Sequence, residues 1–126
     1  MTPEQLQLLA LEALDEGKGR DVLALDVEHL TTIADHMIIA TGTSPRHVKA
    51  LADRVLEAVK AAGRRPLGVE GLEQAEWVLL DLGDVIVHVM QEETRAFYDL
   101  ERLWQDVPVP VPSGGNVVPL HEAALR

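Results

Sequence analysis

Hydrophobic residues recur along the chain with two periods, which predict helices in some stretches and strands in others. Two stretches show the 3.6-residue spacing of a helix with one buried side. Thr2-Pro3 opens the first, with Gln5 completing a capping box, and Ser44-Pro45 opens the second. Glycines at 17 and 63 mark their ends. The apolar positions are Leu6, Leu9, Ala10, Ala13 and Leu14 in the first helix, and Val48, Leu51, Ala52, Val55, Leu56 and Val59 in the second.

The remaining apolar runs predict five strands and a last helix. We expect strands over about 22–27, 37–40, 67–70, 77–81 and 84–90, and a helix over about 92–104 with Phe97, Leu100 and Trp104 as its buried stripe. This order predicts an α/β (mixed α+β) fold, a mixed five-stranded sheet with helices packed on it. Residues 1–105 then form one domain. Residues 106–126, which begin with alternating valine and proline, form a C-terminal tail.

The hairpin over 77–90 is the most informative element. A loop of Leu82-Gly83 would pair Asp81 with Asp84, Leu79 with Ile86 and Trp77 with His88. Because side chains alternate between the two faces of a strand, one face is uniformly aliphatic and suits a core. It carries Val78, Leu80, Val85, Val87 and Val89.

The other face of this hairpin combines aromatic, aliphatic, acidic and imidazole side chains. It carries Trp77, Leu79, Asp81, Asp84, Ile86, His88 and Met90. Protein-binding surfaces have this composition, with aromatic residues at the centre and polar groups at the rim. We therefore predict a partner-binding surface. Two alternatives stay open, namely that a helix or the C-terminal tail covers this face, or that it joins two copies of the chain in a homodimer.

Charge and cysteine content restrict the classes of partner and compartment. The chain has 21 Asp and Glu against 11 Lys and Arg, a net charge of −10, and no cysteine. Nucleic-acid binding through phosphates requires basic patches, so it is not expected as the main activity, whereas a basic protein partner is favoured. The absence of cysteine suits a reducing cytoplasm. No apolar run approaches the roughly 20 residues that cross a bilayer, so we expect a cytoplasmic protein without a membrane partner.

Four sequence blocks resemble the ribosomal silencing factor family, which is related to iojap. They are Asp35 through Arg46 (DHMIIATGTSPR), Glu70-Gly71, Trp77 through Val89 (WVLLDLGDVIVHV) and Arg95 through Trp104 (RAFYDLERLW). The blocks stand in the family's order and at its spacing, and the resemblance covers about residues 3–106. His36 occupies a position where many relatives have an aromatic residue, which is a mild departure.

The resemblance implies a fold like that of nucleotidyltransferases without their catalytic residues, and it implies no enzyme activity and no cofactor. It also implies binding to ribosomal protein fourteen of the large ribosomal subunit. A factor bound there blocks joining of the two subunits and represses translation when nutrients are short, and organelle relatives act in large-subunit assembly. Combined with the hairpin, it predicts a partner-binding set of Trp77, Leu79, Asp81, Asp84, Ile86 and His88, joined by Glu70 and Tyr98.

The alternative function is a metal-dependent nucleotidyl- or phosphotransferase that uses Asp81, Asp84 and Glu70. Asp is common beside tight turns, however, and these residues with His88 make no metal site unless further ligands converge. Ser44 is better explained as a helix cap than as a phosphate ligand. We therefore predict no catalytic and no metal-binding residues. Arg95 and Asp99 fit the spacing of an ion pair within the last helix.

Overall fold

The computed structural model describes residues 1–105. This part of the chain folds as a five-stranded mixed sheet with helices on both faces. The elements are α1 (Pro3–Glu16), β1 (Arg20–Asp26), β2 (His36–Gly42), α2 (Pro45–Ala61), β3 (Gly68–Glu70), β4 (Trp77–Asp81), β5 (Val85–Gln91), α3 (Glu92–Tyr98) and α4 (Leu100–Gln105). The strand order is β1-β2-β5-β4-β3, with β2 and β5 parallel and the other neighbours antiparallel. The predicted C-terminal tail lies outside the described residues.

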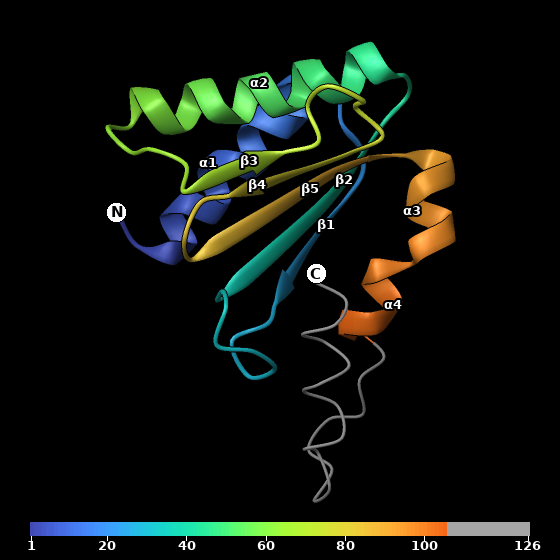
Figure 1. The fold of residues 1–126 in the computed structure, drawn as a ribbon. Helices are drawn as coiled ribbons and strands as arrows, with labels where there is room; N and C mark the ends of the chain where they lie inside the picture. The colour runs from blue at the N-terminus through green and yellow to red at the C-terminus, as the bar shows by residue number, and fades with distance from the viewer. Residues whose placement is uncertain (106–126) are drawn as a thin grey trace, which may run out of the picture.

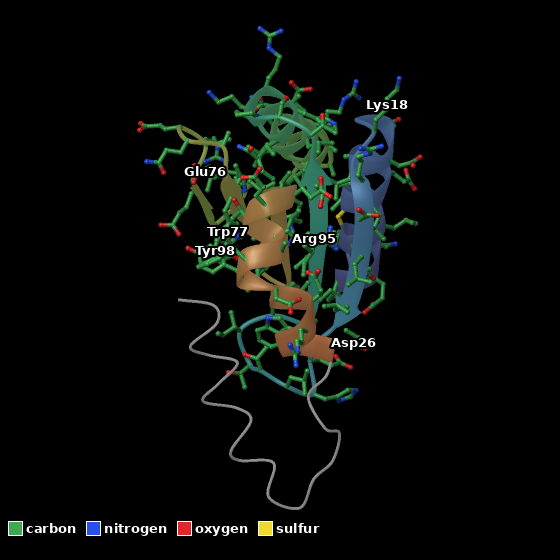
Figure 2. The ribbon with its side chains drawn as sticks, turned by 90° about the vertical axis from the view of Figure 1, so that its right-hand side faces the viewer. Lys18, Asp26, Glu76, Trp77, Arg95 and Tyr98 are labelled. Carbon is green, nitrogen blue, oxygen red and sulfur yellow. The ribbon has the colours of Figure 1, made fainter. Side chains whose placement is uncertain are left out.

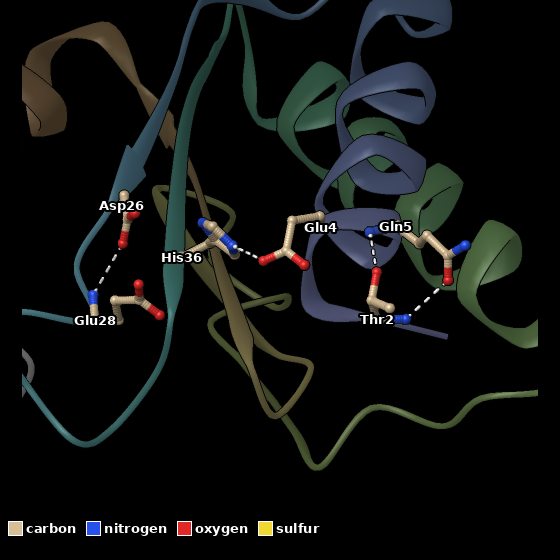
Figure 3. A network of polar contacts seen from close by, with 6 residues as sticks. All are labelled: Thr2, Glu4, Gln5, Asp26, Glu28 and His36. Atoms are coloured by element: carbon tan, nitrogen blue, oxygen red, sulfur yellow. Dashed lines mark hydrogen bonds and ion pairs between the residues drawn. The ribbon is translucent and has the colours of Figure 1, made fainter.

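Both long helices begin where their capping residues predicted. The Thr2 hydroxyl accepts a hydrogen bond from the Gln5 backbone N–H, and the Gln5 side chain accepts one from the Thr2 N–H, at 3.1 and 2.8 Å (Figure 3). The Ser44 hydroxyl accepts a bond from the His47 N–H at 3.1 Å. These bonds satisfy backbone donors that a helix start leaves unpaired, which confirms Ser44 as a cap.

Two hydrophobic clusters lie on opposite faces of the sheet. α1 and α2 cover one face, as Figure 1 shows, and bury the aliphatic side of the hairpin with exposures of 0% for Val78, Leu80, Val85, Val87 and Val89. The second cluster joins Met37, Ile39 and Met90 to Leu100 and Trp104 of α4. The predicted assignment of the hairpin faces is therefore confirmed. Every helix among residues 1–105 is too short or too polar to span a bilayer.

The predicted register of the hairpin is wrong by two residues. Asp81 pairs with Ile86, Leu79 with His88 and Trp77 with Met90. The Leu82 N–H donates to the Val85 carbonyl at 2.9 Å, so the loop consists of Gly83 and Asp84. Gly83 has a φ of +96°, and glycine is favoured at either position of such a loop, which is why its identity did not settle the register. A shift of two residues leaves every side chain on its predicted face.

The single last helix that the sequence predicted is broken at Asp99. This residue has a left-handed backbone (φ 51°, ψ 50°), which ends α3 and turns the chain into α4. Asp tolerates this conformation better than most residues. The turn moves Phe97 off the buried stripe, so Phe97 is 80% exposed whereas Leu100 and Trp104 are 2% and 3% exposed.

Candidate partner-binding site

Three aromatic side chains from β4 and α3 form the centre of the candidate site. The Trp77 and Tyr98 rings are 4.8 Å apart between centroids, and the Tyr98 and Phe97 rings are 5.0 Å apart in an edge-to-face arrangement. Such tilted geometries are favourable for aromatic pairs. We call Trp77, Phe97 and Tyr98 the aromatic ledge. Figure 2 shows Trp77 and Tyr98 on the same side of α3.

The ledge is much more exposed than aromatic residues in a core. Phe97 is 80% exposed, Tyr98 is 50% exposed and Trp77 is half-buried. Isolated exposed apolar residues are ordinary, but three adjoining aromatic rings are a feature of protein-binding surfaces. The spacing of apolar residues did not predict that Phe97 is exposed, because it placed Phe97 on the buried side of one continuous helix.

His88 is a buried residue that contacts Trp77 of the ledge. The Trp77 indole N–H donates a hydrogen bond to the Nδ1 atom of His88 at 2.9 Å. His88 is 0% exposed, and burial lowers its pKa from 6.5 to about 4 because a charged imidazole loses its hydration there. The ring is therefore neutral near pH 7, with Nδ1 as the acceptor.

Three of the predicted site residues on or beside the hairpin are acidic: Glu70, Asp81 and Asp84. Asp84 and Glu70 are exposed, while Asp81 and Leu79 are half-buried. The Asp81 Oδ1 atom accepts a hydrogen bond from the Gly83 N–H at 2.9 Å, so this carboxylate also holds the hairpin loop. Glu70 lies on β3, the edge strand beside the hairpin, and pairs with Leu79 of β4.

Ile86 and His88 were predicted to contact a partner, but the structure buries both side chains. Ile86 is 4% exposed and His88 is 0% exposed. Both residues lie on β5, which has β2 on one side and β4 on the other. The hairpin alone would leave this face open to solvent. In the complete fold, the face is buried at Ile86 and His88. Six of the predicted residues therefore stay accessible at least in part: Glu70, Trp77, Leu79, Asp81, Asp84 and Tyr98.

Arg95 does not make the helical ion pair with Asp99 that its spacing suggested. Its Nε atom donates to both carboxylate oxygens of Glu101 at 3.3 Å instead. Its Nη1 atom donates to the Asp21 carbonyl at 2.7 Å and to the Thr41 hydroxyl at 2.8 Å. These partners lie far apart in the sequence, so no helical spacing rule identifies them.

The carboxylates proposed for the enzyme alternative do not converge. Among residues 1–105, the Asp, Glu and His side chains that place three ligand atoms within 4.8 Å of one another are Asp26, Glu28 and His29, all exposed. Figure 3 shows that Asp26 accepts a bond from the Glu28 backbone N–H, at 3.2 Å, which is ordinary loop geometry. Glu70, Asp81, Asp84 and His88 form no such group.

His36, the residue that departs from the pattern of the family that the sequence resembles, makes a polar contact on the opposite face of the sheet. The Nε2 atom of His36 lies 3.2 Å from a carboxylate oxygen of Glu4, so it links the start of β2 to α1 (Figure 3). His36 is buried while Glu4 is exposed. An exposed partner of this kind contributes little to stability.

The chain is similar to known proteins both in sequence and in structure. A family model described as "Ribosomal silencing factor during starvation" matches residues 1–124. The ribosomal silencing factor of Chromobacterium violaceum is 49% identical over 104 residues, covering 82% of this chain and 85% of its own length. A crystal structure of a C. violaceum protein superposes with a TM-score of 0.81 at 49% identity and covers 82% of this chain and 87% of its own.

A more distant relative comes from an organelle. The mouse protein named "Mitochondrial assembly of ribosomal large subunit protein 1" is 29% identical over 99 residues. The match covers 76% of this chain and 43% of the mouse protein.

Proposed function

The chain belongs to the ribosomal silencing factor family, and from that premise we propose that its aromatic ledge docks on ribosomal protein fourteen of the large ribosomal subunit. The observation that carries this proposal is the partly exposed cluster of the Trp77, Tyr98 and Phe97 rings on a chain of net charge −10. Aromatic side chains supply much of the binding energy of protein interfaces. Acidic groups favour association with a basic ribosomal protein.

In this proposal the bound protein blocks joining of the small subunit by occupying space, and translation is repressed. The family description refers to silencing during starvation, and the mouse relative is named for assembly of the large subunit. Both names connect the family to the ribosome. Steric blocking needs a rigid body held at a fixed orientation. The sheet and its two buried clusters supply such a body.

We further propose that the protein acts without a catalytic step. The carboxylates of the rival enzyme do not gather into a ligand group, and Asp81 is engaged in the hairpin loop. Ser44 serves as a helix cap, so the turn before α2 needs no phosphate ligand to explain its sequence. Nucleotidyl transfer by the purified protein with a divalent metal, abolished in an Asp81→Asn variant, would contradict this.

The primary experiment is co-sedimentation of the purified full chain with isolated ribosomal subunits. Binding to large but not small subunits is expected, together with a fall in the yield of joined ribosomes when both subunits are mixed. A protein that remains in the supernatant with both subunits would refute the ribosomal role. If a homodimer used the same face, the protein would be dimeric when alone and monomeric when bound to the large subunit.

A further inference from the structure

The helix that carries two rings of the aromatic ledge is weakly held by apolar packing. α3 contains no buried residue, and its last two residues, Phe97 and Tyr98, are exposed. No side chain caps its N-terminus at Gln91. α4, by contrast, buries Leu100 and Trp104 in the second hydrophobic cluster. Apolar burial therefore fixes α4 directly, while the orientation of α3 requires another restraint.

Arg95 supplies that restraint from the middle of α3. Its side chain is 12% exposed and donates to three acceptors on three other elements, which are Asp21 of β1, Thr41 of β2 and Glu101 of α4. In Figure 2, Arg95 lies toward β1 and β2, while Trp77 and Tyr98 lie on the other side of α3. The helix is thus held on one side by a polar cluster and contacts the Trp77 ring on the other.

Two departures from regular backbone present these acceptors to Arg95. The ladder between β1 and β2 is irregular between Arg20 and Leu23, and Asp21 has a φ of +47°. Asp21 has no partner in the register of that ladder, so its carbonyl is available to the guanidinium group. The left-handed residue Asp99 turns α4 so that Glu101 meets Arg95 across the break. Residues with positive φ that are not glycine are uncommon, and here two of them flank one side chain.

We propose that Arg95 is a positioning residue for partner binding, which holds α3 so that Tyr98 packs against Trp77. The functional part of this inference rests on the docking proposed above. A guanidinium group is suited to the role because its planar array of N–H donors serves several acceptors at fixed angles. A lysine ammonium group at the same place would keep the charge without that geometry. Arg95 itself touches no partner and acts through Tyr98.

The test measures the Trp77–Tyr98 contact and binding separately, on the full chain. Incorporation of 5-fluorotryptophan gives fluorine resonances for Trp77 and Trp104, which a Trp77→Phe variant assigns. Tyr98→Ala defines the position of the Trp77 resonance when the neighbouring ring is absent. Arg95→Lys and Arg95→Met are compared with Arg65→Lys, a matched change at an exposed arginine after α2. Affinity for isolated large subunits is measured for the same proteins.

We expect Arg95→Met and Arg95→Lys to move the Trp77 resonance toward its position in Tyr98→Ala, and Arg65→Lys to leave it unchanged. We also expect roughly tenfold weaker binding for Arg95→Met, and little further loss when Tyr98→Ala is added, because the two residues act as one unit. If Arg95→Met does not fold, Thr41→Val removes one acceptor only and is expected to move the resonance by a smaller amount in the same direction.

An unchanged Trp77 resonance in folded Arg95 variants would overturn the positioning role. A strictly additive loss of binding in the double variant would overturn it as well. If the resonance moved while neither Tyr98→Ala nor Arg95→Met altered subunit binding, the positioning of Tyr98 would stand and the proposed docking face would be refuted.

Discussion

The Trp77 indole N–H donates to the Nδ1 atom of His88 at 2.9 Å, and this bond joins the central ring of the aromatic ledge to a buried imidazole. The donor of Trp77 is therefore used within the protein. In the proposed docking, the partner would therefore meet the face of the indole and the rings of Tyr98 and Phe97. Aliphatic side chains and the cations of lysine or arginine bind such faces well, which agrees with a basic protein partner.

The first prediction concerns the pH dependence of stability through His88. Burial lowers its pKa to about 4 in the folded protein, whereas the unfolded chain titrates near 6.5. The unfolded state then binds the extra proton between these values, so the stability linked to His88 is complete above pH 6.5 and is lost as the pH falls toward 4. The loss is about 3 kcal/mol.

Denaturant unfolding of the wild type and His88→Asn at pH 7 and pH 4.5 measures this effect. The asparagine Oδ1 atom takes the place of Nδ1 as acceptor for the Trp77 N–H, and asparagine does not titrate. The difference in stability between the two proteins should shrink or reverse at pH 4.5. A difference that is independent of pH would show that His88 does not carry the lowered pKa.

The second prediction concerns Trp77 as the central contact. Trp77→Ala should weaken binding to isolated ribosomal protein fourteen by about 2 kcal/mol or more, near thirtyfold in affinity, because it removes the central ring of the ledge. Leu8→Ala, at an exposed apolar residue of α1, is the control and should leave the affinity unchanged. Circular dichroism checks that both variants fold. A folded Trp77→Ala protein with wild-type affinity would exclude this face as the docking site.

The third prediction concerns Asp81 and Asp84, the acidic residues at the loop end of the hairpin. Replacing Asp81 and Asp84 together by Asn should slow association more than it speeds dissociation, because charges near a rim mainly steer the encounter. The amide side chain introduced by Asp81→Asn keeps an oxygen acceptor for the Gly83 N–H, so the loop should survive the change. The difference from wild type should diminish at high salt, as stopped-flow or surface-binding kinetics would record. An effect confined to dissociation and insensitive to salt would argue for direct hydrogen bonds instead.

The fourth prediction concerns Gly71, which supports the start of β4. Its φ is +89°, and a Cβ atom there would overlap the Trp77 carbonyl oxygen. Gly71→Ala should therefore destabilise the fold by about 3 kcal/mol or more, since both backbone strain and a backbone clash oppose it. Gly63→Ala is a matched control, because Gly63 has a φ of +80° but open space around it. That variant should cost about 1 kcal/mol. Equal unfolding midpoints for the two would show that the clash is relieved.

Much of the fold followed from patterns that are local in the sequence. The caps at Thr2 and Ser44 and the apolar spacing of the two long helices depend on residues within a turn or two of each other, so they were readable from the sequence. The faces of the hairpin survived an error in its register. A shift by two residues does not alter which side a strand residue occupies.

The candidate site was predicted in part, because alternation identifies a face but not what covers it. Trp77, Asp84 and Glu70 are accessible in the structure, whereas His88 and Ile86, on the same predicted face, are buried. Their burial depends on strands and helices that lie elsewhere in the chain.

The sequence by itself determined the order of the elements, the aliphatic side of the sheet, the acidic charge and the family. Each of these is encoded in residue identity or in spacing over a few positions. Only the tertiary structure decided that the last helix breaks at Asp99, that Phe97 becomes exposed, and that Arg95 bonds to Asp21, Thr41 and Glu101. These depend on backbone conformation at single residues and on contacts across as many as 74 positions of sequence, which no local period records.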